Sequence, residues 1–187
     1  DTVVFSVSPS DLTLDRPGVV EVRLSGAPPS TGYQVELGWD PAAVAVTAVA
    51  PGEFLAVGGQ TTLSPRFAGA GSLLIAEVLT GAAPSGDLPS GEGTLAYVTL
   101  APLGTAARSE LTLSGASLLG PSGEAIPAAL TTGGLVTVEV PASEPQQTAA
   151  AAQAAALVEQ LGESSGSGRA GLPGLGSLAL PKPGSTA

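Results

Sequence analysis

Cysteine and histidine are both absent from the sequence, and so are methionine and asparagine. Without cysteine the chain can form neither a disulfide framework nor a thiolate metal site. Without histidine it lacks the commonest general base of enzymes and the commonest protein ligand of metal ions. These absences argue against an enzyme. A chain poor in thermolabile side chains also suits a hot or oxidising environment, as in a thermophile.

Positive charge is scarce too. Six basic residues stand against 16 acidic ones, which gives a formal net charge of -10. A chain without a basic patch has nothing to neutralise the phosphates of nucleic acid or the surface of an anionic membrane. The sequence also has no run of the roughly 18 apolar residues that a membrane-spanning helix requires. We therefore expect that the protein does not bind nucleic acid and has no membrane-spanning segment.

The chain is rich in apolar residues, glycine and proline. Apolar residues make up 43% and charged residues 12%, with 26 glycines and 17 prolines in 187 residues. This balance favours many short strands joined by tight turns, and the length allows one well-filled domain with an appendage. The start at Asp1, directly before a strand pattern, resembles a mature N-terminus after signal removal. We expect a protein that is secreted, periplasmic or displayed on the cell surface.

Period-two alternation of apolar and polar residues recurs along the first 141 residues. In 33–41, Val35, Leu37 and Trp39 face one way, and Gln34 and Glu36 face the other. The stretch 72–80 is almost wholly apolar, as in a strand covered on both sides. Ten candidate segments account for the roughly nine strands expected, and they are 2–9, 15–26, 33–41, 43–51, 53–57, 61–65, 72–80, 94–102, 109–120 and 134–141. The pattern predicts an all-β fold, an antiparallel β-sandwich.

The composition changes after Pro141. Residues 142–147 form a polar linker, and the alanine-rich stretch 148–162 is a strong helix former, with Thr148 as N-cap and Gly162 as the residue after the helix. A helix of this length is marginal alone in water, so we expect it to dock on something. Residues 163–187 are rich in glycine, serine and proline and are expected to be a flexible tail.

Three segments, in this order, resemble the cohesin domain. The first is 33–55, with an aromatic-Asp-Pro turn and a Val-x-x-Gly-x-Phe ending; its matching residues are Trp39, Asp40, Pro41, Val44, Val49, Gly52 and Phe54. The second is 72–81 followed by 91–103, and the third is 109–127 followed by 133–140. The resemblance covers residues 1–140. It implies a jelly-roll sandwich that binds a protein partner, which in cellulosomes is a dockerin.

The resemblance also implies a partner-binding face. In cohesins this face includes outward residues of the strand before the Asp-Pro turn and the glutamate of the apolar strand, which here are Gln34, Glu36 and Glu77. Many cellulosomal cohesins carry Asn and Asp shortly before that turn, where this chain has Gly32 and Gln34. We expect a non-catalytic interaction or scaffolding module whose partner is dockerin-like or another component of an envelope assembly.

Two other functions are open. A carbohydrate-binding module needs exposed aromatic rings that stack on sugars. We assign Trp39, Phe5 and Phe54 to the core. The predicted stacking residues are then Tyr33 and Tyr97, and Phe67 is the one other aromatic residue that remains. A structural subunit of a surface filament or secretion complex would self-associate through residues 148–187, where 177–181 are strand-like.

No cofactor is expected from the sequence. Loop carboxylates could hold Ca²⁺, although no EF-hand spacing appears; the candidates are Asp11, Asp15, Asp87 and Glu92.

Overall fold

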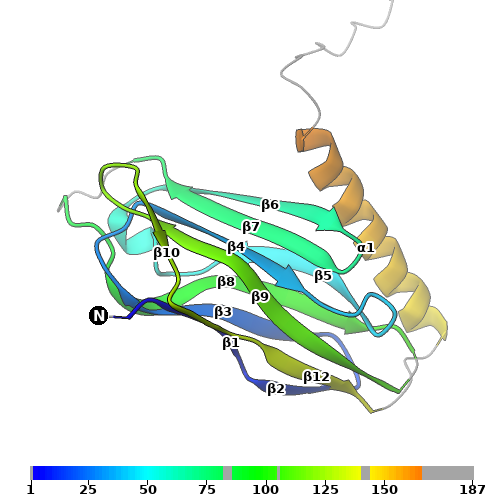
Figure 1. Cartoon of the computed structure of the whole chain (residues 1–187). Helices are drawn as coiled ribbons and strands as arrows, with labels where there is room; N and C mark the ends of the chain where they lie inside the picture. Colours follow the sequence, from blue (N-terminus) through cyan, green and yellow to red (C-terminus); the bar gives the residue numbers. More distant parts are fainter. Residues whose placement is uncertain (1, 82–85, 105, 140–143, 166–187) are drawn as a thin grey trace, which may run out of the picture.

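The chain forms two β-sheets packed face to face, with one helix at the side (Figure 1). The computed structural model describes residues 2–81, 86–104, 106–139 and 144–165. The first sheet has the order β11-β1-β3-β8-β5, and the second has the order β2-β12-β9-β4-β7-β6, with β10 paired to β9. The predicted sandwich is therefore confirmed.

The strands of the first sheet are β1 (Val4–Ser8), β3 (Gly18–Ala27), β5 (Val44–Pro51), β8 (Gly91–Pro102) and β11 (Leu130–Thr132). Those of the second sheet are β2 (Asp11–Leu14), β4 (Gly32–Gly38), β6 (Thr61–Gly69), β7 (Ser72–Leu79), β9 (Ala107–Leu119), β10 (Ala125–Pro127) and β12 (Gly134–Val138).

Alternating side chains of both sheets fill the space between them. On β4, Val35 and Leu37 are fully buried while Gln34 faces outward, as the alternation predicts. Phe5 of β1 and Phe54 after β5 also lie in the core, which agrees with their assignment from the sequence. Since the inner faces of aligned sheets interdigitate, this single apolar layer accounts for most of the burial in the sandwich.

The strand prediction differs from the structure in four places. The structure has twelve strands where about nine are expected, because β2, β10 and β11 are only three or four residues long and carry no readable alternation. The predicted strand 53–57 is wrong: it contains a turn and the start of a 3-10 helix, η1 (Ala56–Gly58). Two of the pairings, β1 with β11 and β2 with β12, are parallel, so the sandwich is not wholly antiparallel.

Strand β7 is the fourth difference. Its inward residues Leu73 and Ile75 are fully buried, but its outward residues Leu74 and Ala76 are half-buried, and Val78 is 41% exposed. The apolar outer side of this strand is therefore accessible, and the prediction that both sides are covered is wrong.

The helix α1 (Glu144–Ser165) is longer than the sequence indicates. It begins within the predicted linker, so Thr148 is not its N-cap, and Gly162 lies inside it rather than beyond its end. Residues 166–187, most of the predicted tail, lie outside the described residues. No helix in the described ranges is long and apolar enough to cross a membrane.

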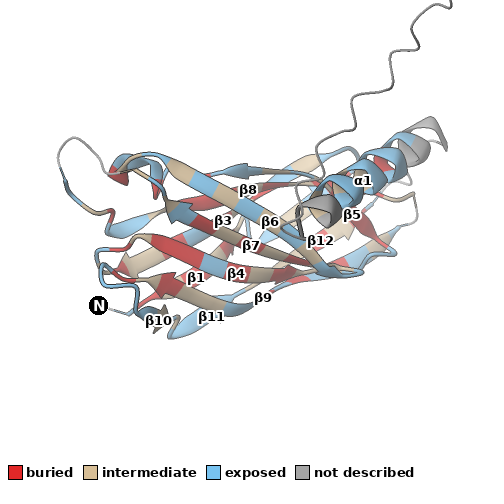
Figure 2. Ribbon diagram, turned by 90° about the horizontal axis from the view of Figure 1, so that it is seen from above, coloured by how far each residue is buried: buried red, intermediate tan, exposed pale blue. Residues whose placement is uncertain are grey.

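The docking surface of α1 is the sandwich of the same chain. It packs beside β5 and β6, the strands at one edge of each sheet (Figure 1). Ala150, Ala154, Leu157 and Leu161 recur at helical spacing and are its less exposed residues, while much of the rest of the helix is exposed (Figure 2). Covering two open sheet edges with a helix protects them from pairing with other chains.

An apolar cavity of about 590 Å³ lies under α1. Its walls include Trp39, Pro41 and Phe67 from the sandwich and Val158 from the helix. Trp39, expected to anchor the core, is only partly buried and instead packs against the edge of the core at this cavity. The helix and the one tryptophan of the chain therefore line the same cavity.

Candidate binding surfaces on the two sheets

The outer face of the second sheet carries Gln34 and Glu36, two of the residues predicted to bind a partner. Both project outward from β4, with Gln34 exposed and Glu36 half-buried. The carboxylate of Glu36 accepts a short hydrogen bond from the hydroxyl of Ser72, the first residue of β7. This bond fixes one carboxylate oxygen in the middle of the sheet.

Strand register places these two residues in rows that cross four strands. Residues directly opposite one another share a face of the sheet. One row runs through Arg66, Leu74, Glu36 and Ser114, and the next through Ser64, Ala76, Gln34 and Ser117. A third row holds Thr62, Val78, Gly32 and Leu119. We refer to these twelve residues as the partner face.

The partner face is apolar along β7 and mostly polar and uncharged elsewhere, apart from Gly32 and Leu119 in its third row. Leu74, Ala76 and Val78 form its apolar stripe, which lies between the outward residues of β6 (Thr62, Ser64, Arg66) and those of β4 (Gly32, Gln34, Glu36). Its formal charges are those of Glu36 and Arg66. An accessible apolar stripe within a rim of small polar residues is typical of a protein-binding surface.

Glu77, the third residue predicted to bind a partner, lies inside the sandwich. It is 1% exposed, and neither carboxyl oxygen has a hydrogen-bond partner in the structure. It shares the inward direction of Leu73 and Ile75 on β7. The prediction that Glu77 contacts a protein partner is therefore wrong, because its side chain cannot reach a protein docked on the outer face.

Tyr33, a predicted stacking residue for carbohydrate, is also buried. Its hydroxyl donates a hydrogen bond of 2.8 Å to the carbonyl oxygen of Leu95 on the opposite sheet. Burial first, and then the carboxyl of Glu77 opposite it on β7, raise the pKa of Tyr33 far above its ordinary value. A ring that joins the two sheets from within cannot stack on a sugar, so this assignment is corrected as well.

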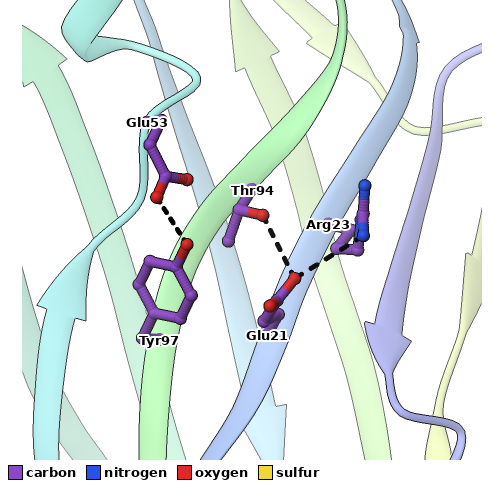
Figure 3. Close-up of polar contacts among 5 residues, drawn as sticks. All are labelled: Glu21, Arg23, Glu53, Thr94 and Tyr97. Atoms are coloured by element: carbon purple, nitrogen blue, oxygen red, sulfur yellow. Dashed lines mark hydrogen bonds and ion pairs between the residues drawn. The ribbon is translucent and has the colours of Figure 1, made fainter.

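Tyr97, the second predicted stacking residue, lies on the outer face of the first sheet (Figure 3). Its hydroxyl donates a hydrogen bond of 2.5 Å to Oε1 of Glu53. This bond lowers the pKa of Glu53 and raises the pKa of Tyr97. The ring is thus held at both ends, by its strand and by its hydroxyl.

Three polar residues continue this network across the first sheet. Thr94 donates a hydrogen bond of 3.2 Å to Oε2 of Glu21, and the same oxygen lies 3.6 Å from the guanidinium of Arg23 (Figure 3). Glu21 is the direct cross-strand neighbour of Tyr97. We refer to Tyr97, Glu53, Glu21, Arg23 and Thr94 as the tyrosine face.

The candidate calcium ligands do not form a cluster. Asp11 begins β2 and Asp15 follows it, beside Arg16, whereas Asp87 and Glu92 lie just before and at the start of β8. Across the described ranges, no group of three or more acidic residues is close enough to hold a metal ion. These four residues therefore give no support to a shared site.

Comparison with known proteins identifies the fold. No family model matches the chain, and no curated protein matches it either. Among solved structures it is similar to a non-cellulosomal cohesin from the hyperthermophilic archaeon Archaeoglobus fulgidus, with 16% identity over 74% of this chain and 92% of the cohesin and a TM-score of 0.58.

Two bacterial structures give the same result. The sixth cohesin of scaffoldin B from Acetivibrio cellulolyticus, solved with a dockerin, is 16% identical over 74% of this chain and all of its own, with a TM-score of 0.60. A cohesin from Clostridium acetobutylicum is 20% identical over 74% of this chain and 91% of its own, with a TM-score of 0.56. At these identities the likeness establishes the cohesin fold and nothing beyond it.

Proposed function

We propose that this chain is a non-catalytic, extracytoplasmic interaction module that binds a protein partner through the partner face. The observation that supports this most strongly is the accessible apolar stripe of Leu74, Ala76 and Val78 on a strand that lies inside its sheet rather than at an edge. Val78 is 41% exposed and Leu74 and Ala76 are half-buried, although the core beneath them is already complete. A partner would bury apolar surface there.

The polar residues of the partner face suit such a contact. Glu36 lies in the first row, oriented by Ser72, and can accept a hydrogen bond from a partner without a large loss of side-chain entropy. Gln34 beside it offers both a donor and an acceptor. The surrounding serines and threonines are short, so a partner could approach the sheet closely.

The resemblance to cohesins suggests which kind of partner. The cohesin from Acetivibrio cellulolyticus was solved in complex with a dockerin. By that likeness, the partner of this chain is a dockerin-like module or another component of a secreted or cell-surface assembly. Gly32 and Gln34 differ from the Asn and Asp of many cellulosomal cohesins, so we expect the partner to differ from cellulosomal dockerins where it meets β4.

The proposal does not extend to self-association through α1. The apolar residues of this helix pack on the sandwich of the same chain, which leaves mainly alanine and polar residues outside. Of the exposed large apolar residues, Val158 is the one on the helix. The strand-like stretch 177–181 lies outside the described residues.

The test is selective capture of a partner. The full chain, immobilised, is incubated with the envelope and secreted fractions of its source organism, alongside Ala76→Arg on the partner face and Ala48→Arg on the outer face of the first sheet. Both alanines point outward from strands, so the two substitutions place the same charge on opposite faces. The proposal requires a protein retained by the wild type and Ala48→Arg but lost from Ala76→Arg. Equal capture by all three, or none by the wild type, would contradict it.

A further inference from the structure

We propose that the tyrosine face is a second binding site, on the opposite side of the sandwich from the partner face, and that its ligand is a neutral polysaccharide. The argument rests on where the aromatic residues lie, how the ring of Tyr97 is held, and which charges surround it. It is independent of whether the partner face binds a protein.

Tyr97 differs from the other five aromatic residues, all of which lie in the described part of the chain. Phe5, Tyr33 and Phe54 are buried in the core. Trp39 and Phe67 pack against it under α1. Only the ring of Tyr97, which is half-buried, lies on the outer face of a sheet.

The ring of Tyr97 is held in place before any ligand arrives. The 2.5 Å hydrogen bond to Glu53 ties its hydroxyl to the segment that follows β5. Such bonds to a carboxylate are short and strong. A side chain already fixed in one orientation loses little entropy when a sugar ring stacks on it.

The neighbours of Tyr97 leave one side open and supply polar groups on the other. On β5 the residue opposite it is Ala50, which is exposed and too small to cover the ring. On β3 the residue opposite it is Glu21, whose carboxylate accepts a hydrogen bond from Thr94 and forms an ion pair with Arg23. A flat ring beside fixed hydrogen-bonding groups matches the apolar face and the hydroxyls of a pyranose.

The charges of this face select the ligand. Glu21 and Glu53 outweigh Arg23, and the whole chain carries a formal charge of -10. An acidic polysaccharide or a nucleic acid would be repelled. A neutral glycan is not, and its hydroxyls can donate to the carboxylates and accept from the guanidinium. Because the face is the flat surface of a sheet, it suits a long chain that lies along the strands.

Affinity electrophoresis of the full chain tests the proposal. The gels contain one soluble neutral polysaccharide each, a β-glucan, an α-glucan or a mannan, with an acidic pectin and a polysaccharide-free gel as references. We expect retardation by at least one neutral polymer. Tyr97→Ala should weaken it about tenfold, the loss expected for one stacked aromatic ring. Tyr97→Phe, which keeps the ring but frees it from Glu53, should weaken it less.

Ala76→Arg on the partner face is the control and should be retarded as the wild type is. Retardation by none of the neutral polymers would overturn the proposal, and so would a Tyr97→Ala variant retarded as strongly as the wild type. Retardation by pectin alone would overturn the assignment of a neutral ligand. Because Tyr97 lies on the outer face rather than in the core, its replacement should leave the chain folded, and melting curves of the variants separate lost binding from lost folding.

Discussion

The rings of Trp39 and Phe67 meet edge to face, with their centroids 6.1 Å apart and their planes at 71°. Trp39 directly follows β4 and Phe67 lies on the edge strand β6, so the contact joins the end of β4 to the edge of the second sheet. Both rings line the cavity under α1. The single tryptophan of the chain therefore reports on whether the helix is docked.

Releasing α1 should change the fluorescence of Trp39. Leu157 packs against the core from the helix, so Leu157→Asp should undock α1, shift the emission of Trp39 to the red and increase its quenching by acrylamide. Ala156→Asp, at an exposed position of the same helix, is the matched control and should change neither. An unshifted spectrum in Leu157→Asp would mean that the helix is not held by this face.

Two glycines should differ sharply in their tolerance of a methyl group. A Cβ on Gly52 would lie 2.1 Å from the backbone carbonyl oxygen of Thr94, whereas one on Gly69 would meet nothing within 4 Å. Since backbone cannot move aside as a flexible side chain can, Gly52→Ala should lower the free energy of unfolding by about 2–3 kcal/mol or more. Gly69→Ala should change it by less than about 0.5 kcal/mol. Urea denaturation of both variants measures the difference.

Replacing the buried Glu77 should stabilise the fold. Both of its carboxyl oxygens are buried without a hydrogen bond, and such groups cost roughly 1–3 kcal/mol each. Glu77→Leu removes that penalty and adds an apolar side chain opposite Leu63, which packs against the core. Calorimetry should show a higher melting temperature. A lower one would indicate that the carboxyl interacts favourably with Tyr33, which lies opposite it on β4.

Stability should fall at alkaline pH through Tyr33. Its pKa is raised in the folded chain, so above about pH 10 the unfolded chain loses this proton while the folded chain keeps it. The unfolded state then binds fewer protons, and the free energy of unfolding declines by up to about 1.4 kcal/mol per pH unit. The contribution of Tyr33 is fully present below pH 10.

Tyr33→Phe isolates this effect. The variant loses the hydrogen bond to Leu95, so its stability at pH 7 should drop by about 1 kcal/mol, but its further decline above pH 10 should be shallower than that of the wild type. An equally steep decline in both proteins would show that Tyr33 ionises freely.

The alternation of β4 predicted most of what the structure shows of that strand. Val35 and Leu37 point inward and Gln34 and Glu36 outward. The same parity places Tyr33 inside, so its burial could have been read from the sequence had the rule been applied one residue earlier. The resemblance to cohesins predicted the sandwich, and the likeness to solved cohesin structures supports the same fold.

The directions of the side chains of β7 were harder to predict from the sequence. Leu74, Ala76 and Val78 are as apolar as Leu73 and Ile75, so alternation could not decide which way Glu77 points. The pairing register with β4 decided it instead, because Glu77 lies opposite the inward Tyr33, and only tertiary structure supplies that register. For the same reason the sequence could not show that the apolar outer side of β7 remains uncovered.

Short apolar runs were the other source of error. Phe54 and Leu55 are buried as strand residues would be, but the amide of Phe54 bonds to the carbonyl of Thr94 at the end of a turn, and η1 follows. The length of α1 was misjudged because Glu144 and its neighbours are polar and Pro145 looked like a linker residue. Proline is accepted in the first turn of a helix, where its missing N–H is not needed.

The most direct test of the partner face is a calorimetric titration of the captured partner into three proteins: the wild type, Ala76→Arg and Ala48→Arg. We predict that Ala76→Arg weakens binding about thirtyfold or more, which corresponds to about 2 kcal/mol at the centre of an interface, and that Ala48→Arg matches the wild type within twofold. Loss of affinity in Ala48→Arg with full affinity in Ala76→Arg would place the partner on the opposite sheet and contradict the proposed function.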